Sequence, residues 1–380
     1  MAQAALLTGV EEFIAEHVLP LDDEHDGDVE AAGGESLRAR LQAGARERGL
    51  LSPHGPRDLG GLGLGMVERA PLFEAAGRSL FGPMALNVNA PDEGNIHLLD
   101  VVATAAQRER YLRPLVRGEV RSAFAMTEPA PGAGSDPSLL TTTATRVAGG
   151  WLINGRKWFI TGADGAGFYI VMARTSGEPG DPGGATMMLA PADRTGIKVD
   201  RHIGTIDRSM LGGHCEVTFT DVVVPDDDVL GGVDEGFRYA QVRLGPARMT
   251  HVMRWTGAAQ RAHEVAIRHV ASRRAFDGRL ADLGTCVRRP RRSDASDARW
   301  ALIGPVLTAW RARTCTPLKP CVIGRAFGRL MQHRRRSVMP RQTRADEVGR
   351  ARQTPPGPRA WNAVDACSAE RTRGGAKPLR

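Results

Sequence analysis

Two segments of the chain concentrate side chains that could form a binding site. Residues 122–137 read SAFAMTEPAPGAGSDP, and residues 154–163 read NGRKWFITGA. The first segment offers hydroxyl groups in a loop rich in glycine and proline, and the second offers an aromatic pair followed by a threonine. Asn154-Gly155 lies between two apolar runs and predicts a β-hairpin. The simplest alternative to a binding role is therefore that Trp158 and Phe159 only form the core of that hairpin.

Two other motifs could do chemistry, and each has a simpler explanation. Asp22, Asp23, His25 and Asp26 could bind a metal, but an acidic stretch without defined cage geometry is more typical of a solvated loop, and we predict no metal site. The run GGLGLG at 60–65 lacks the third glycine of a phosphate-binding loop, because Met66 stands there, and no strand precedes it. We interpret it as a flexible loop.

Charge is distributed unevenly along the 380 residues. Residues 286–380 hold 22 Lys and Arg against 6 Asp and Glu, a net charge of +16, whereas residues 1–285 carry a net charge of −8. Four of the five cysteines, Cys286, Cys315, Cys321 and Cys367, also lie in the last quarter, at spacings that fit no zinc pattern. The acidic body (residues 1–285) and the basic tail (residues 286–380) should therefore be interpreted separately.

The elements that would position the candidate residues follow the order α, β, α. Helical spacing of apolar residues occurs at 10–18, where Leu19-Pro20 should end the helix, and again at 35–50, 66–80 and 92–118. Short strand-like runs then occupy 121–235, and a helical pattern begins at Gly236. The predicted fold class is α+β, with an N-terminal helical domain (1–120), a middle antiparallel β-domain (121–235) and the start of a C-terminal helical domain (236–285).

The wording and spacing of these motifs resemble the acyl-CoA dehydrogenase family. The resemblance covers about residues 1–285 and is carried by SAFAMTEPAPGAGSDP, by NGRKWFITGA and by LGPARMTHVMR at 244–254. It implies FAD as cofactor, an acyl-CoA thioester as substrate and α,β-desaturation as the reaction. A flavin must lie flat, shielded from water, with hydrogen bonds at its polar edge.

The resemblance also implies roles for particular residues. Phe124, Met126 and Thr127 match the segment that lines the isoalloxazine, with the threonine hydroxyl bonding its pyrimidine edge. Trp158 and Phe159 match the aromatic wall, Thr161 matches the residue near flavin N5, and Ser135 matches a contact to both flavin and substrate.

Three further matches lie in the expected C-terminal helices. Arg248 matches an active-site arginine on the first helix, although a surface ion pair is the alternative. Arg273 and Phe276 match an Arg-x-x-Phe motif that reaches the FAD of a partner subunit, and a guanidinium suits its pyrophosphate. Asp277 stands where the family usually has glycine.

The catalytic base of the family has no counterpart in this chain. Proton removal alpha to a thioester needs a positioned carboxylate. Most members carry it in a downstream motif resembling Tyr-(Glu/Asp)-Gly-(Thr/Pro)-x-Glu, which is absent from 286–380, and a minority place it immediately before the helix arginine, where this chain has Ala247. The catalytic residue is therefore unknown.

Three explanations account for residues 286–380, where arginine outnumbers lysine 20 to 2, apolar residues keep no helical period and prolines are too frequent for the long helices of the fold. The first is a frameshifted reading of GC-rich coding sequence. The second is an acquired basic, largely disordered tail that binds an acidic partner or nucleic acid. The third is a divergent helical domain. The expected C-terminal domain is thus truncated or aberrant.

The sequence and the resemblance together suggest where the protein works and with what. No apolar run of 18 residues predicts a membrane span, and no signal peptide precedes Glu11, so a cytoplasmic location is the expectation. The family implies an electron-transfer flavoprotein as oxidant and a homodimer or homotetramer built by the C-terminal helices. Nucleic acid is not an expected partner. Alternatives to the enzyme are an inactive flavin-binding remnant and a basic-tailed binding protein.

The frameshift explanation predicts a result at the level of DNA. A one-nucleotide shift near codons 284–287 should restore an amphipathic helical sequence that ends in a carboxylate-glycine motif. Sequencing the coding DNA and translating it in all three frames checks this. Early stop codons in both alternative frames would exclude the frameshift.

Overall fold

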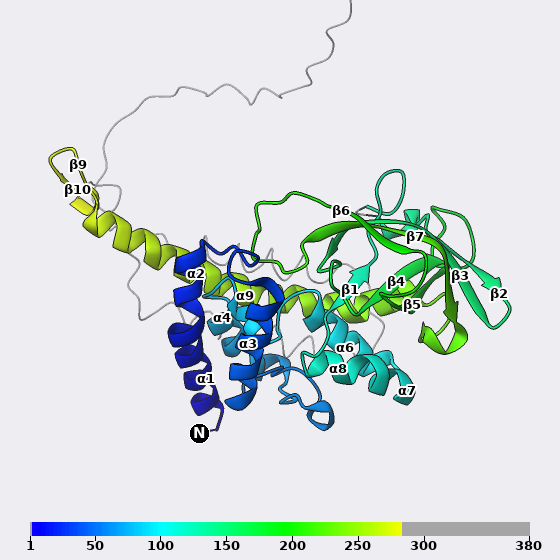
Figure 1. The fold of residues 1–380 in the computed structure, drawn as a ribbon, viewed down its shortest axis with the longest axis horizontal. Coiled ribbons are helices and arrows are strands. Elements are labelled where there is room, and N and C mark those ends of the chain that lie inside the picture. The colour runs from blue at the N-terminus through cyan, green and yellow to red at the C-terminus, as the bar shows by residue number, and fades with distance from the viewer. Residues whose placement is uncertain (1, 135, 283–380) are drawn as a thin grey trace, which may run out of the picture. The chain divides into compact units, whose positions relative to one another are not determined.

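The computed structural model describes residues 2–134 and 136–282, so Ser135 and the basic tail lie outside the described residues. Helices come first in the described part, a sheet follows, and one long helix comes last (Figure 1). The predicted α+β order of helices, sheet and helix is confirmed.

The N-terminal region consists of short helices and single turns. They are α1 (Ala2–Phe13), a π-helical turn (Ile14–Val18), α2 (Leu19–His25), α3 (Gly34–Glu47), a 3-10 turn (Arg57–Leu59), α4 (Met66–Ala76), α5 (Gly82–Ala85), α6 (Asp92–Val102), α7 (Ala105–Gln107), a second π-helical turn (Arg108–Leu112) and α8 (Arg113–Val116).

The expectation that Leu19-Pro20 ends the first helix is wrong. The chain continues through the π-helical turn into α2, where Pro20 occupies the first turn. Proline is tolerated there because the amide it lacks has no intrahelical partner in that turn. The acidic stretch 22–30 is accordingly not all loop: Asp22 lies in α2 and accepts hydrogen bonds from the amides of Leu80 and Phe81 at 2.8 and 3.3 Å.

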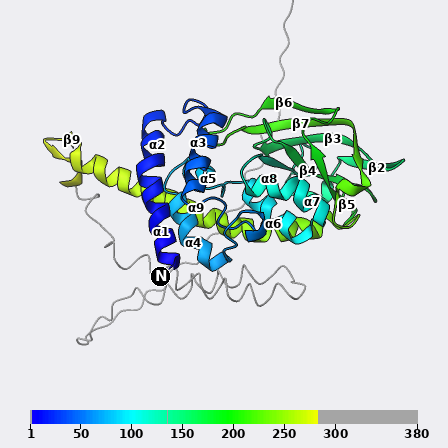
Figure 2. The ribbon, with the colours of Figure 1, turned by 60° about the horizontal axis from the view of Figure 1, so that its bottom comes forward.

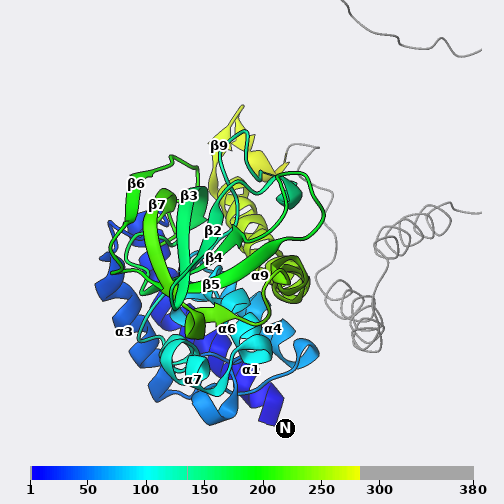
Figure 3. The same ribbon diagram turned by 90° about the vertical axis from the view of Figure 1, so that its right-hand side faces the viewer.

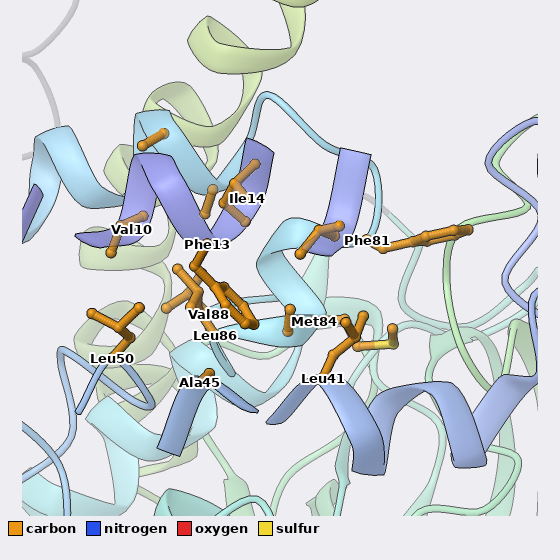
Figure 4. Packing of buried hydrophobic residues seen from close by; sticks show 14 of the residues in the cluster. Val10, Phe13, Ile14, Leu41, Ala45, Leu50, Phe81, Met84, Leu86 and Val88 are labelled. Atoms are coloured by element: carbon orange, nitrogen blue, oxygen red, sulfur yellow. The ribbon is translucent and has the colours of Figure 1, made fainter. Parts of the chain in front are cut away.

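These helices enclose their own apolar core. Figure 4 shows Phe13 and Ile14 packed among side chains from α3, α5 and the segment that follows α5, including Leu41, Met84 and Leu86. Phe13, Ile14, Leu41, Met84 and Leu86 are all buried. Burial of about five such side chains supplies several kcal/mol of hydrophobic stabilisation, which makes this region a stable support for the helices that meet the sheet.

The middle region is an eight-stranded sheet of order β6-β7-β3-β2-β4-β5-β8, with β1 beside β4. Its strands are β1 (Ser122–Ala125), β2 (Thr143–Val147), β3 (Gly150–Thr161), β4 (Phe168–Arg174), β5 (Ala185–Pro191), β6 (Ile197–His202), β7 (His214–Pro225) and β8 (Val229–Leu230), with 3-10 turns at Pro137–Leu139 and Asp226–Asp228. Most pairs are antiparallel as predicted, but β1 runs parallel to β4, and β2 also meets β4 in parallel where Thr143 pairs with Arg174.

The hairpin predicted at Asn154-Gly155 is wrong. Strand β3 runs unbroken through these residues, and the turn lies between Val147 and Gly150. Asn154-Gly155 instead forms an irregularity in the β3–β7 pairing, where Asn154 and Asp221 exchange two hydrogen bonds of 2.9 Å. A Cβ on Gly155 would lie 2.4 Å from Thr142 Oγ1. The glycine is therefore required for close approach of a neighbouring segment and not for a turn.

Helix α9 (Gly236–Ser272) passes beneath the sheet and beside the N-terminal helices (Figures 2 and 3). Its first half is buried along a face that includes Arg243, Ala247, Thr250 and Arg254. In its second half, Trp255 and Val265 are exposed among the described residues. A short hairpin of β9 (Arg274–Ala275) and β10 (Gly278–Arg279), followed by a 3-10 turn (Leu280–Asp282), ends the described chain. Within the described residues, no helix has the length and apolar character needed to cross a membrane.

His54 is half-buried in the N-terminal region, and both of its ring nitrogens are withdrawn from solvent. Among the described residues, neither ring nitrogen has a hydrogen-bond partner. The centre of the imidazole ring lies 5.8 Å from the centre of the Phe73 ring in an edge-to-face contact. Burial, followed by the positive charges of Arg69 and Arg254, holds the pKa of His54 well below its ordinary value. The folded protein therefore resists protonation that the unfolded chain accepts near pH 6.5.

This burial predicts a pH-dependent loss of stability. Because the folded-state pKa of His54 is depressed, the unfolded chain binds the proton first, and the free energy of unfolding falls as the pH drops through about 6.5. Between pH 7.5 and 5.5 the His54→Gln variant should lose about 1 kcal/mol less than the unmodified protein. Urea unfolding at both pH values measures this. His263→Gln, on the exposed side of α9, should behave like the unmodified protein, and equal losses in all three would contradict the assignment.

Candidate functional site

The two motif segments meet across strand β3. The amide of Trp158 donates to the Thr127 carbonyl at 3.1 Å, and the Thr127 hydroxyl donates to the Trp158 carbonyl at 2.6 Å. These two hydrogen bonds join Thr127, which lies just after β1, to Trp158 within β3. Segments some thirty residues apart in sequence therefore form one surface.

A β-bulge presents the aromatic pair on this surface. The β3–β7 register shifts between Lys157 and Ile160, so that Trp158 and Phe159 together oppose a single residue of β7. Phe159 has φ of 51°, a left-handed conformation that is unfavourable for a bulky residue, and it is 47% exposed. Bulges and strained residues of this kind concentrate beside functional sites. The two rings contact each other edge to face at 5.0 Å.

The other predicted flavin contacts of the middle region lie around this surface. Thr161 ends β3 and its hydroxyl is 3.0 Å from His214 Nδ1. Met126 is half-buried directly before Thr127. Phe124 lies in β1, with the Arg243 guanidinium 4.0 Å from the centre of its ring. Arg243 is itself buried, and burial lowers its pKa to about 10.

A buried ion pair lies directly behind the same surface. Lys157 and Glu128 are 0% and 1% exposed, and the ammonium nitrogen is 2.8 Å from Glu128 Oε1. Burial alone raises the pKa of Glu128, but the Lys157 charge and hydrogen bonds from Thr141 and Thr142 outweigh it and lower the pKa. Burial lowers the pKa of Lys157, with Glu128 opposing that shift. Both charged groups are therefore withdrawn from solvent and stabilised by each other.

The predicted substrate arginine lies on a different element. Arg248 is exposed on α9, one residue after the buried Ala247. Its side chain makes no hydrogen bond or ion pair within the described residues. The Thr250 hydroxyl lies 2.8 Å from Glu93 Oε2 and 3.0 Å from the Ala247 carbonyl, and its single hydrogen can be donated to either acceptor. Glu93 is buried, and its other carboxylate oxygen has no partner in the described part of the chain.

The structure does not bring Arg273 and Phe276 to this surface. They follow the C-terminal end of α9, whose 37 residues span about 55 Å, and Figures 1 and 2 show their hairpin far from the sheet. Phe276 and Asp277 are the two loop residues of that hairpin, with φ of 53° and 60°. A left-handed φ is unfavourable for the bulky Phe276, whereas aspartate is one of the residues that adopt it more readily. Ser135 lies outside the described residues.

The residues at the β3 bulge suit a flat ring system with a polar edge. Phe159 offers half of its surface to a ligand, and aromatic faces pack against planar rings. The Thr127 hydroxyl, whose hydrogen goes to Trp158, keeps lone pairs that can accept from a ring N–H. The donor set therefore fits the isoalloxazine of FAD.

Family models match the chain in three consecutive pieces. The acyl-CoA dehydrogenase N-terminal domain matches residues 1–119, the middle domain matches 123–222 and the C-terminal domain matches 234–289. A Mycobacterium tuberculosis protein, "Probable acyl-CoA dehydrogenase FadE2", is 38% identical over 285 residues, which cover 73% of this chain and 69% of that protein. The chain belongs to the acyl-CoA dehydrogenase family. The recognition made from the two motifs is confirmed, and the family is one of oxidoreductases.

Other proteins similar to this chain include a longer relative and two solved structures. Mouse acyl-CoA dehydrogenase family member 10 is 36% identical over 285 residues, but the chain spans only 27% of it. A Mycobacterium abscessus structure described as an acyl-CoA dehydrogenase superposes with a TM-score of 0.68 at 36% identity, covering 82% of this chain and 78% of that one. A Bacillus anthracis acyl-CoA dehydrogenase complexed with FAD superposes with a TM-score of 0.62 at 26% identity, covering 74% of this chain and 47% of that one.

Sequence reasoning missed the buried polar residues around the site. Glu128 and Lys157 lie inside the two quoted motifs, but their immediate neighbours Thr127 and Arg156 are polar, so the local sequence gave no signal of burial. Arg243 and Glu93 lie on helices that were interpreted only as apolar stripes. Their burial follows from how α6 and α9 cross, which a one-dimensional pattern does not contain.

Proposed function

We propose that residues 1–282 form the flavin- and thioester-binding body of an FAD-dependent acyl-CoA dehydrogenase. The observation that carries this proposal is the reciprocal pairing of Thr127 with Trp158, which sets the bulged Phe159 beside the threonine of the first motif. This arrangement combines an exposed aromatic face with an adjoining polar edge, as a flavin requires.

The reaction is α,β-desaturation of an acyl-CoA thioester: a base removes the α-proton, and the β-carbon gives up a hydride. FAD, when bound, supplies the hydride acceptor at flavin N5. In this chain Trp158 and Phe159 exclude water from one side, while Phe124, Met126, Thr127 and Thr161 surround the ring. Arg248 and Ser135 are proposed contacts to the thioester substrate.

Turnover is impaired in this chain because neither base position is filled. Ala247 has no ionisable group, and residues 286–380 contain no motif of the family type. General-base catalysis contributes about 10²–10⁴-fold in rate. An inactive flavin-binding remnant is the alternative from the same family, and the buried Glu93 beside Thr250 is the carboxylate to test if activity is found.

The proposed partners follow the family. An electron-transfer flavoprotein is the oxidant, and oligomerisation places Arg273 and Phe276 of one subunit against the FAD of another. This contact fits their distance from the bulge within one chain.

We also propose that the domain boundaries lie at residues 120, 235 and 285. A basic-tailed binding protein is supported only by the charge of residues 286–380.

The flavin site predicts that one substitution weakens FAD binding while changing the free energy of unfolding little. Phe159→Gly removes the aromatic wall and should weaken FAD binding at least about tenfold, equivalent to about 1.4 kcal/mol. Its unfolding free energy should change by no more than about 1 kcal/mol, because relief of the left-handed φ offsets the lost packing. Flavin fluorescence titration and urea unfolding measure the two quantities. Unchanged FAD affinity would count against a flavin at the bulge.

The missing base predicts that the purified chain has no measurable acyl-CoA dehydrogenase turnover, even with FAD added. Dye-coupled assays with short, branched and long acyl-CoA substrates test this. Robust activity would show that a base exists elsewhere. Loss of that activity in Glu93→Gln, with FAD binding intact, would then identify Glu93 as the base.

A further inference from the structure

Lysine is rare in this chain, and one lysine is completely buried. Only four of the 51 Lys and Arg residues are lysines. Of the two within the described residues, Lys198 is largely exposed, whereas Lys157 is 0% exposed in the centre of β3. A buried cation survives only where every donor is satisfied, so its surroundings indicate why position 157 is not arginine.

Three acceptors surround the Lys157 ammonium. They are the Met126 carbonyl at 3.1 Å, the Glu128 carboxylate at 2.8 Å and the Met172 carbonyl at 2.7 Å. A tetrahedral ammonium has three donors that can serve three acceptors converging on one point, whereas a planar guanidinium spreads five donors over a fork. The cavity therefore selects lysine by geometry as well as by charge.

The Glu128 carboxylate in turn organises the loop that follows. Its oxygens accept from the amides of Ala133, Thr141 and Thr142 at 3.1, 2.8 and 2.9 Å, and from the Thr141 hydroxyl at 2.7 Å. A Cβ on Gly132 would lie 2.3 Å from Glu128 Oε2, so only glycine lets the loop close around the carboxylate. The described loop residues are thus tied to a single side chain.

The ion pair is adjacent in sequence to both halves of the candidate flavin surface. Met126, whose carbonyl Lys157 binds, directly precedes Thr127, and Lys157 itself directly precedes the bulged Trp158-Phe159. A shift of the Lys157 or Glu128 side chain should therefore move Thr127 and the β3 bulge, because each of them is one residue away in sequence from a group that the ion pair holds.

We propose that Lys157 and Glu128 are positioning residues of the flavin site: the three-donor ammonium and the carboxylate together fix the described loop residues 128–134 and 136–142, Thr127 and the β3 bulge in the geometry that binds FAD. This inference rests on the proposed flavin site but concerns the loop independently of the cofactor. The ammonium geometry is essential, so a positive charge of another shape does not replace it.

The test compares four variants of the full chain. Lys157→Met, Lys157→Arg and Glu128→Gln should each weaken FAD binding at least about tenfold. In the absence of FAD they should also increase hydrogen exchange at least tenfold in the peptide that contains Ala133, Thr141 and Thr142, relative to a peptide from α3 in the same sample. Lys198→Met, which removes an equal charge from an exposed lysine paired with Asp200 on β6, should change neither quantity.

A control for general destabilisation uses Asp228→Asn. Asp228 is buried and accepts from the Tyr111 hydroxyl at 2.8 Å, so its loss lowers stability at another junction of the fold. It should leave FAD affinity and the relative exchange of the loop unchanged. Equal effects in Asp228→Asn and Lys157→Met would overturn the positioning role and leave only a structural one.

The two measurements separate this inference from the proposed function. If the unmodified chain binds no FAD, the proposed function fails, and faster loop exchange in the three variants still supports the ion pair as the organiser of the loop. Unchanged loop exchange in Lys157→Met overturns the inference whatever the FAD result. Normal exchange and FAD affinity in Lys157→Arg overturn the claim that geometry, and not charge, selects lysine.

Discussion

The cost of burying charge shapes the centre of this protein. Lys157 and Glu128 are both withdrawn from water, and breaking such a pair typically costs about 3–5 kcal/mol. The structure meets this constraint by surrounding the pair with backbone carbonyls and amides from three segments: the strand β4, the end of β1 and the loop after it. Those segments consequently have little freedom to move independently. The loop, the bulge and the threonine of the first motif are held by the requirement to satisfy one ammonium and one carboxylate.

Helix α9 imposes a second constraint because one element serves two regions. Its N-terminal half carries Arg243 against Phe124 and Thr250 against Glu93, so polar contacts join it to the sheet and to α6. Its C-terminal half presents Trp255 and Val265 to solvent among the described residues and ends in the hairpin that bears Phe276. A helix of this length places Arg273 at its C-terminal end, apart from the sheet that carries the β3 bulge.

The Asn154-Gly155 dipeptide shows how a local signal can be correct about a residue and wrong about its role. Asparagine and glycine between apolar runs favour a two-residue turn, but Gly155 is needed because Thr142 approaches it, and Asn154 instead pairs with Asp221 on β7. Pro20 is a similar case, since a π-helical turn before it lets the helix continue. Both errors arise because the competing contacts come from residues distant in sequence.

The sequence by itself determined the family, the α, β, α order and the two motif segments, because these depend on local periodicity and on short, specific residue patterns. Only the tertiary structure decided which of the candidate residues meet. It joins Thr127 to Trp158, exposes Phe159 at a bulge, leaves Arg273 and Phe276 at the far end of α9, and buries Glu128, Lys157 and Glu93. The physical reason is that burial of a charged or polar group is set by partners contributed from separate strands and helices, and these partners are specified only when the sheet and helices pack together.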